Sequence, residues 1–110
     1  MKKILLDENL PKKLKITFAS EHEVFTVREK NWNGKRNGEL LGVMTLNGFD
    51  VFVTIDKNLQ HQQNIKRFLI KLIILDAPNN KIETLIPYIE KLTAIFSTPI
   101  ENQIVIVNLE

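Results

Sequence analysis

The sequence predicts a three-layer α/β domain with a mainly parallel central sheet and helices on both of its faces. Short apolar segments alternate along the chain with longer segments of helical periodicity. The short segments are continuously apolar, which is typical of parallel strands that are buried between two layers of helices. A length of 110 residues fits one domain, so residues 1–110 are expected to fold as a single unit.

The first half of the chain is expected to supply two strands and two helices. These are a strand at 4–6, a helix capped by Asn9 with Pro11 in its first turn, a strand at 23–27, and a helix at 40–46 capped by Asn37. Leu10, Leu14 and Phe18 recur every four residues, which places them on one face of the first helix.

The second half is expected to complete the sheet. Its elements are strands at 50–54, 68–75 and 103–109, and a helix at 82–96 with a kink or restart at Pro87. Right-handed crossovers bring every strand-to-helix loop to the same edge of a parallel sheet. In the strand order 2-1-3-4-5, strands one and three are neighbours at the point where the order reverses, and ligands bind there.

Three carboxylates are predicted to meet at that edge. Asp7 follows the first strand, Glu39 lies in the first turn of the second helix, and Asp56 follows the third strand. Each has an ordinary explanation as a turn, helix-dipole or capping residue. Together they predict a site for a hard cation such as Mg²⁺ or Mn²⁺, which activates water and neutralises the charge of a phosphodiester under attack. Glu8 and Asp76 lie close enough in this arrangement to join the site.

The composition excludes several classes of protein. The chain has no cysteine, which excludes thiolate-bound zinc and disulfides and fits a reducing cytoplasm. No apolar run approaches ~18 residues, so no membrane span is expected. Residues 1–75 carry 13 Lys and Arg against 8 Asp and Glu, whereas residues 76–110 carry 2 against 5. The excess of cations in the first part permits a face that binds polyanions.

The loop at 28–36 concentrates cations around the single tryptophan. Its charged and aromatic residues that suit RNA are Arg28, Lys30, Trp32, Lys35 and Arg36. Such a loop can hold phosphates and stack a base. The alternative is a solvated loop whose tryptophan packs on the domain or on a partner.

Three motifs together resemble a small PIN-like family. They are Asp7-Glu8-Asn9-Leu10-Pro11, Asn37-Gly38-Glu39-Leu40-Leu41 and Thr54-Ile55-Asp56-Lys57-Asn58-Leu59. The family is described as predicted nucleases of predicted toxin–antitoxin systems and is related to an exonuclease C-terminal domain. The resemblance extends from about residue 3 to residue 76.

This resemblance implies a metal-dependent ribonuclease with Asp7, Glu39 and Asp56 as catalytic and metal-binding residues. Many relatives carry aspartate where this chain has Asn37, and Asp-x-Asp where this chain ends the motif with Asn58. An amide oxygen can bind a metal but lacks the negative charge, so weakened or lost catalysis is an open alternative. Supporting roles are expected for Glu8, Asn37, Lys57, Asn58 and Asp76.

The expected function is therefore a toxin ribonuclease, with Mg²⁺ or Mn²⁺ as cofactor and with RNA and an antitoxin protein as partners. A homodimer is compatible with this interpretation. One alternative is a catalytically weak or inactive module that binds RNA or protein. A receiver-type phosphoacceptor domain is the second, since it also carries acids after its first and third strands. Asp76-Ala77-Pro78 follows the fourth strand here, where a receiver has Ser or Thr.

Overall fold

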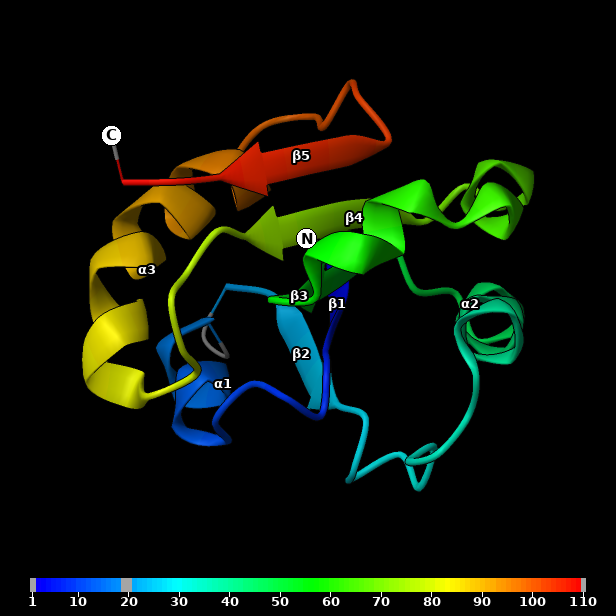
Figure 1. Cartoon of the computed structure of the whole chain (residues 1–110), viewed down its shortest axis with the longest axis horizontal. Helices are drawn as coiled ribbons and strands as arrows, with labels where there is room; N and C mark the ends of the chain where they lie inside the picture. The colour runs from blue at the N-terminus through cyan, green and yellow to red at the C-terminus, as the bar shows by residue number, and fades with distance from the viewer. Residues whose placement is uncertain (1, 19–20, 110) are drawn as a thin grey trace.

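The computed structural model describes residues 2–18 and 21–109, without the side chains of Phe18, Asn37, Gln63 and Asn64. The strands are β1 (Lys3–Leu6), β2 (Glu23–Thr26), β3 (Val51–Thr54), β4 (Lys71–Leu75) and β5 (Ile104–Val107). The helices are α1 (Lys13–Phe18), α2 (Asn37–Leu46) and α3 (Ile82–Phe96), with the 3₁₀ helices η1 (Lys57–His61) and η2 (Gln63–Arg67) before β4. Figure 1 shows their arrangement.

The central sheet has the predicted class and order. Its five strands run β2-β1-β3-β4-β5, and every neighbouring pair is parallel. β1 therefore lies between β2 and β3, and the carboxyl ends of β1 and β3 meet. The prediction of an α/β sheet with strands one and three adjacent is confirmed.

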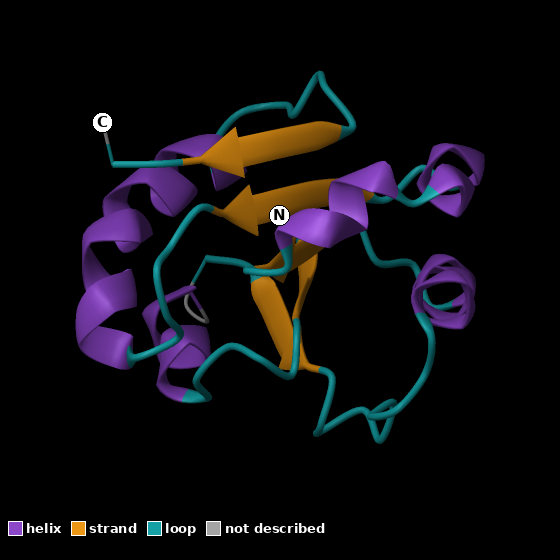
Figure 2. Cartoon of the chain, in the orientation of Figure 1, coloured by secondary structure: helices purple, strands orange, loops and turns teal. Residues whose placement is uncertain are grey.

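Each face of the sheet is covered by helices, as Figure 2 shows. On one face, α1 and α3 pack on strand residues that include Ile4, Val53 and Ile73. On the other face, α2, η1 and η2 pack on the alternate strand residues, among them Leu5 and Phe52. Because successive side chains of a strand point to opposite faces, continuously apolar strands can fill both layers at once.

Two predicted helix starts are wrong. The first helix begins at Lys13 rather than near Pro11, and the Asn9 side chain does not cap it but donates to the Thr54 hydroxyl. The second helix begins at Asn37, so the capping position falls on Arg36. Asn37 therefore lies inside the first turn, and its side chain is outside the described part of the structure.

Two further predictions need correction in the second half of the chain. β4 begins at Lys71 rather than at residue 68, because residues 57–67 form the two 3₁₀ helices. Leu59 and Ile65 from these helices are buried against the sheet, which favours the short helices over an extended chain. α3 continues through Pro87 without a restart. Within the described ranges, no helix has the length and hydrophobicity needed to cross a membrane.

Candidate functional site

The carboxyl ends of β1 and β3 bring two of the predicted acids to one place. Leu6 of β1 lies opposite Val53 of β3. The next residue, Asp7, donates its backbone N–H to the Val53 carbonyl at 2.9 Å. Asp56 follows two residues after the end of β3. The parallel register therefore places both residues at the edge where ligands bind in sheets of this kind.

A buried threonine links the two aspartates. The Thr54 side chain is fully buried, and its hydroxyl donates to Asp7 Oδ2 at 2.7 Å. The Thr54 hydroxyl oxygen also accepts the backbone N–H of Asp56 at 3.0 Å and the Asn9 side-chain amide at 3.3 Å. One donor and two acceptor positions are all that a hydroxyl offers, so every one is used. Thr54 thereby fixes the Asp7 carboxylate and the start of the loop that carries Asp56.

The environment of Asp7 disfavours its negative charge. Burial raises the pKa of the Asp7 carboxyl, and repulsion from Glu8 and Asp56 raises it further. Hydrogen bonds from the Thr54 hydroxyl and the Glu8 backbone N–H oppose this shift but do not cancel it. A carboxylate held ionised in such a place gains from a nearby cation. The repulsion expected between the predicted acids is present, but burial is the larger cause.

Asp56 is exposed and has a local structural task. Its Oδ1 accepts the backbone N–H of Asn58 at 3.0 Å, which caps η1. The capping explanation weighed for Asp56 is thus realised in the fold. Capping occupies one carboxylate oxygen and leaves Oδ2 without a hydrogen bond among the described residues.

Glu39 does not join this pair. It lies exposed in the first turn of α2 and is not among the groups that shift the pKa of Asp7. Within residues 2–18 and 21–109, no three acidic or histidine side chains come close enough to hold a metal ion. The described structure therefore brings together Asp7 and Asp56, with Glu8 beside them, rather than a triad with Glu39.

Two supporting residues bind each other. Lys57 forms an ion pair with Asp76, and both side chains are about half exposed. The Asp76 backbone is held on both sides, since its N–H donates to the Val107 carbonyl at 2.7 Å and its carbonyl accepts the Tyr88 hydroxyl at 2.6 Å. The ammonium group of Lys57 is consequently directed to a carboxylate on the β4 side of the site.

Asn9 is a further candidate site residue that was not among those predicted from the sequence. The Thr54 hydroxyl gives its proton to Asp7, so it can only accept from Asn9, and this fixes which end of the Asn9 amide faces it. The opposite atom, Asn9 Oδ1, is buried without a hydrogen-bond partner in the part of the chain that is described. Unpaired buried oxygens are rare and call for an explanation such as a bound ion. The only sequence signal was the position of Asn9 in the motif that follows the first strand.

The loop after β2 packs some of its side chains on the domain. The Trp32 ring packs edge-on against Phe49, with ring centroids 5.7 Å apart, at the margin of the α2 layer. Lys30 Nζ lies 5.1 Å from the Phe25 ring centroid and 5.4 Å from that of Trp32. Trp32 thus has the packing role that was one of its two interpretations. Lys35, Arg36 and Arg28 remain exposed.

A pocket of about 360 Å³ opens beside Asp7. Glu8, Lys12 and Arg28 line it together with Asp7. A larger pocket of about 520 Å³ lies at the opposite edge of the sheet, where Val51 and Lys71 begin their strands. We place the functional site at the smaller pocket, because ligands of parallel sheets bind at the carboxyl ends of the strands.

No protein-family model matches the chain, and neither a curated protein nor a solved structure matches it significantly.

Proposed function

We propose that this chain is a PIN-like ribonuclease that depends on Mg²⁺ or Mn²⁺ and acts in the cytoplasm as the toxin of a toxin–antitoxin pair. The observation that carries the proposal is the pairing of Asp7 and Asp56 at the switch point of the sheet, with Asp7 partly buried and its pKa raised. A carboxyl with a perturbed pKa in such a crevice is typical of a site that binds a cation or moves a proton. The resemblance of three motifs to the PIN-like family supports the nuclease class.

The residues present fit a hard divalent cation. Asp7 and Asp56 supply carboxylate oxygens. Asn9, whose amide nitrogen donates to the same threonine, adds a neutral Oδ1 that has no hydrogen-bond partner among the described residues. An all-oxygen set of this kind suits Mg²⁺ or Mn²⁺. Such an ion, when bound, supplies activation of water and neutralisation of charge on the phosphodiester. The chain itself orients Asp7 through Thr54 and the Glu8 N–H, which is the task of residues behind a metal ligand.

Metal binding is tested first by thermal unfolding, which does not depend on catalysis. A cation that binds only the folded state should raise the melting temperature by about 5 °C at ten times its Kd. Asp7→Asn and Asp56→Asn should lose this shift, whereas Glu90→Gln, which removes a carboxylate on α3, should keep it. An equal shift in all four proteins would contradict a specific site.

RNA cleavage tests the reaction itself. With Mn²⁺ present, Asp7→Asn should reduce cleavage by more than about 100-fold, the upper range for residues that support a metal. The toxin role is tested by induced expression, where growth arrest by the wild-type chain should be relieved by Asp7→Asn. Growth arrest that persists in Asp7→Asn would contradict a role of nuclease activity in toxicity.

The second candidate is an inactive module on the same scaffold that binds RNA or protein. Two observations favour it. One carboxylate oxygen of Asp56 already accepts the hydrogen bond that caps η1. The described residues also contain no group of three acids that could hold a metal ion. Asn58→Asp separates the two candidates, because it restores the acid that many relatives carry. If the wild type binds RNA without cutting it and Asn58→Asp cuts, the native chain is a binder.

A further inference from the structure

A cationic surface adjoins the acidic pocket on the side of α1 and β2. A third pocket, of about 490 Å³, is lined by Lys12, Lys13, Lys15 and Arg28 and is called the cationic pocket below. It shares Lys12, Thr26 and Arg28 with the pocket beside Asp7. The two pockets are therefore neighbouring parts of one surface, with carboxylates at one end and cations at the other.

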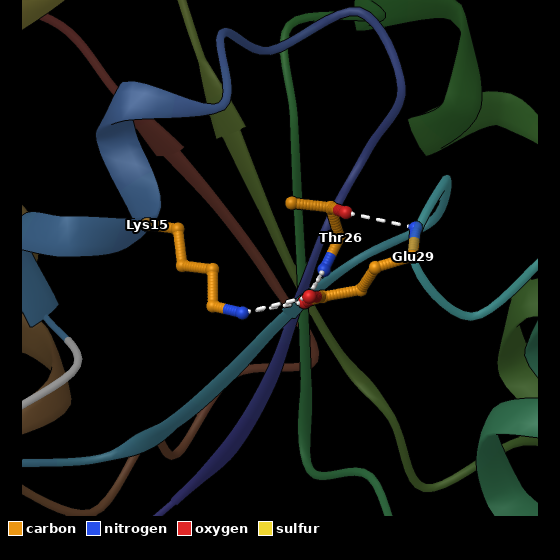
Figure 3. Close-up of polar contacts among 3 residues, drawn as sticks. All are labelled: Lys15, Thr26 and Glu29. Atoms are coloured by element: carbon orange, nitrogen blue, oxygen red, sulfur yellow. Dashed lines mark hydrogen bonds and ion pairs between the residues drawn. The ribbon is translucent and has the colours of Figure 1, made fainter.

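The turn that carries Arg28 is fixed by a reciprocal cap. The Thr26 hydroxyl accepts the backbone N–H of Glu29 at 3.1 Å, and Glu29 Oε1 accepts the backbone N–H of Thr26 at 2.7 Å. Lys15 Nζ lies 2.8 Å from both carboxylate oxygens of Glu29 and ties the turn to α1, as Figure 3 shows. This is the bonding pattern of a capping box, in which the side chains of two residues three apart each accept the other's backbone N–H. Arg28 is thus presented from a constrained turn rather than from a loose loop.

The same contacts leave an excess of positive charge. Glu29 is the only acid among the described residues that line the cationic pocket, and Lys15 neutralises it. Lys12, Lys13 and Arg28 are exposed and have no carboxylate partner among the described residues. Neither Lys12 nor Arg28 is among the groups that shift the pKa of Asp7, although both line its pocket. These cations are available for an anionic ligand.

We infer that Lys12 and Arg28, with Lys13 beyond them, bind the phosphodiester backbone of single-stranded RNA and lead it to Asp7. Unpaired lysine and arginine side chains on one surface match the several phosphates of a polyanion. One phosphate would lie at the acidic end, where a bound divalent metal ion would offset the charge of the carboxylates. The exposed side chain of Ile16 lines the same pocket and offers apolar surface to a ribose or base. This inference rests on the proposed function, and it differs from the sequence-based prediction, which placed RNA on the whole loop 28–36.

Three charge-matched double variants test the inference. Lys12→Ala with Arg28→Ala alters the pocket, Lys35→Ala with Arg36→Ala alters the rest of the loop, and Lys66→Ala with Arg67→Ala alters η2. Each removes one lysine and one arginine from exposed positions, so the net charge falls equally. Affinity for a short fluorescein-labelled single-stranded RNA is measured by anisotropy over a salt series, in EDTA so that no metal-dependent cleavage occurs. Circular dichroism verifies that each variant is folded.

We expect the pocket variant to lose at least about tenfold in affinity, and the other two less than about threefold. Each phosphate contact contributes about 0.7 to the slope of log affinity against log salt on a single strand, so the pocket variant should be shallower by about 1.4. Equal losses in all three variants would overturn the inference in favour of non-specific attraction. The largest loss in the Lys35 and Arg36 variant would overturn it in favour of the loop.

The inference and the proposed function fail in different ways. If metal-dependent cleavage is unaffected in the pocket variant, the pocket is not the path of the RNA, but the proposed nuclease function stands. If RNA binding depends on the pocket but no metal-dependent cleavage occurs, the proposed nuclease function fails, and the pocket stands as an RNA-binding site. A wild-type chain that binds no RNA overturns the inference directly.

Discussion

On the β2 side of the aspartate pair, Lys12, Lys13 and Arg28 have no carboxylate partner among the described residues, whereas on the β4 side Lys57 is paired with Asp76. The β2 side is open and lined by two pockets. Lys57, the cation nearest to Asp56 in sequence, is thus engaged within the fold, while Lys12, Lys13 and Arg28 have no carboxylate partner among the described residues. Proximity to Asp56 in sequence therefore does not predict which cations are left without a carboxylate partner in the fold.

The largest expected effect comes from removing the threonine that links the two aspartates, which lie between the two sides. Thr54→Val keeps the shape of the side chain but leaves Asp7 Oδ2, the Asn9 amide and the Asp56 N–H without their shared partner. Unpaired polar groups in partly buried positions cost about 1–3 kcal/mol each, so we expect a loss of about 3 kcal/mol in the free energy of unfolding. Urea denaturation measures it. Thr54→Ser, which keeps the hydroxyl, is the control, and equal stability of the two variants would contradict the linking role.

The next effect concerns the turn on the β2 side. Thr26→Ala removes the hydroxyl that accepts the Glu29 N–H and should lower the free energy of unfolding by about 1 kcal/mol. Because the turn holds Arg28, affinity for RNA should fall as well. Thr17→Ala, at an exposed position on α1, should change neither quantity appreciably. A loss of stability without any loss of affinity would separate the turn from RNA binding.

A smaller effect should depend on pH. Burial acts to raise the pKa of Glu29, but the hydrogen bonds from Lys15 and Thr26 outweigh it and hold the pKa below the ordinary value of 4.5. A lowered pKa stabilises the fold fully above 4.5, and this contribution is lost as the pH falls through the folded-state pKa. Glu29→Gln should therefore be less stable than wild type near neutral pH, by less than about 1 kcal/mol for so exposed a pair.

The measurement for Glu29 is the difference in melting temperature between the two proteins along a pH series. The difference should shrink to nothing as the pH falls well below 4.5. A difference that stays constant with pH would show that the glutamate acts by packing or by its Thr26 hydrogen bond alone.

The smallest effect lies on the β4 side. Asp76→Asn breaks an exposed ion pair, so the free energy of unfolding should change by less than about 1 kcal/mol. It also frees Lys57, which should raise the affinity for RNA by about twofold. Glu90→Gln removes one negative charge from α3 and controls for net charge. If both variants raise affinity equally, freeing Lys57 has no local effect.

The fold class and the two main acids followed from the sequence. Continuously apolar segments predicted strands buried on both faces, and the right-handed crossover rule predicted that the strand-to-helix loops share one edge. The order 2-1-3-4-5 was expected as one of the common orders of doubly wound sheets. Asp7 directly follows β1, and Asp56 lies two residues after β3. Because the two strands are neighbours, the position of both acids at one edge needed no knowledge of side-chain packing. The capping box was also within reach, because Thr26-x-x-Glu29 carries its pattern, but the loop was interpreted only through its cations and its tryptophan.

What the sequence by itself determined is the set of strands, their order and the edge at which Asp7 and Asp56 lie, because these depend on local patterns and general chirality. The tertiary structure alone decided the partners at that edge. Asn9 is directed to Thr54 rather than to its own helix, Glu39 stays apart from the aspartates, and Arg28 shares a pocket with Lys12. The Asn9–Thr54 contact and the pocket shared by Arg28 and Lys12 join segments that are distant in the chain. Their geometry depends on how each helix packs on the sheet, which no local pattern specifies.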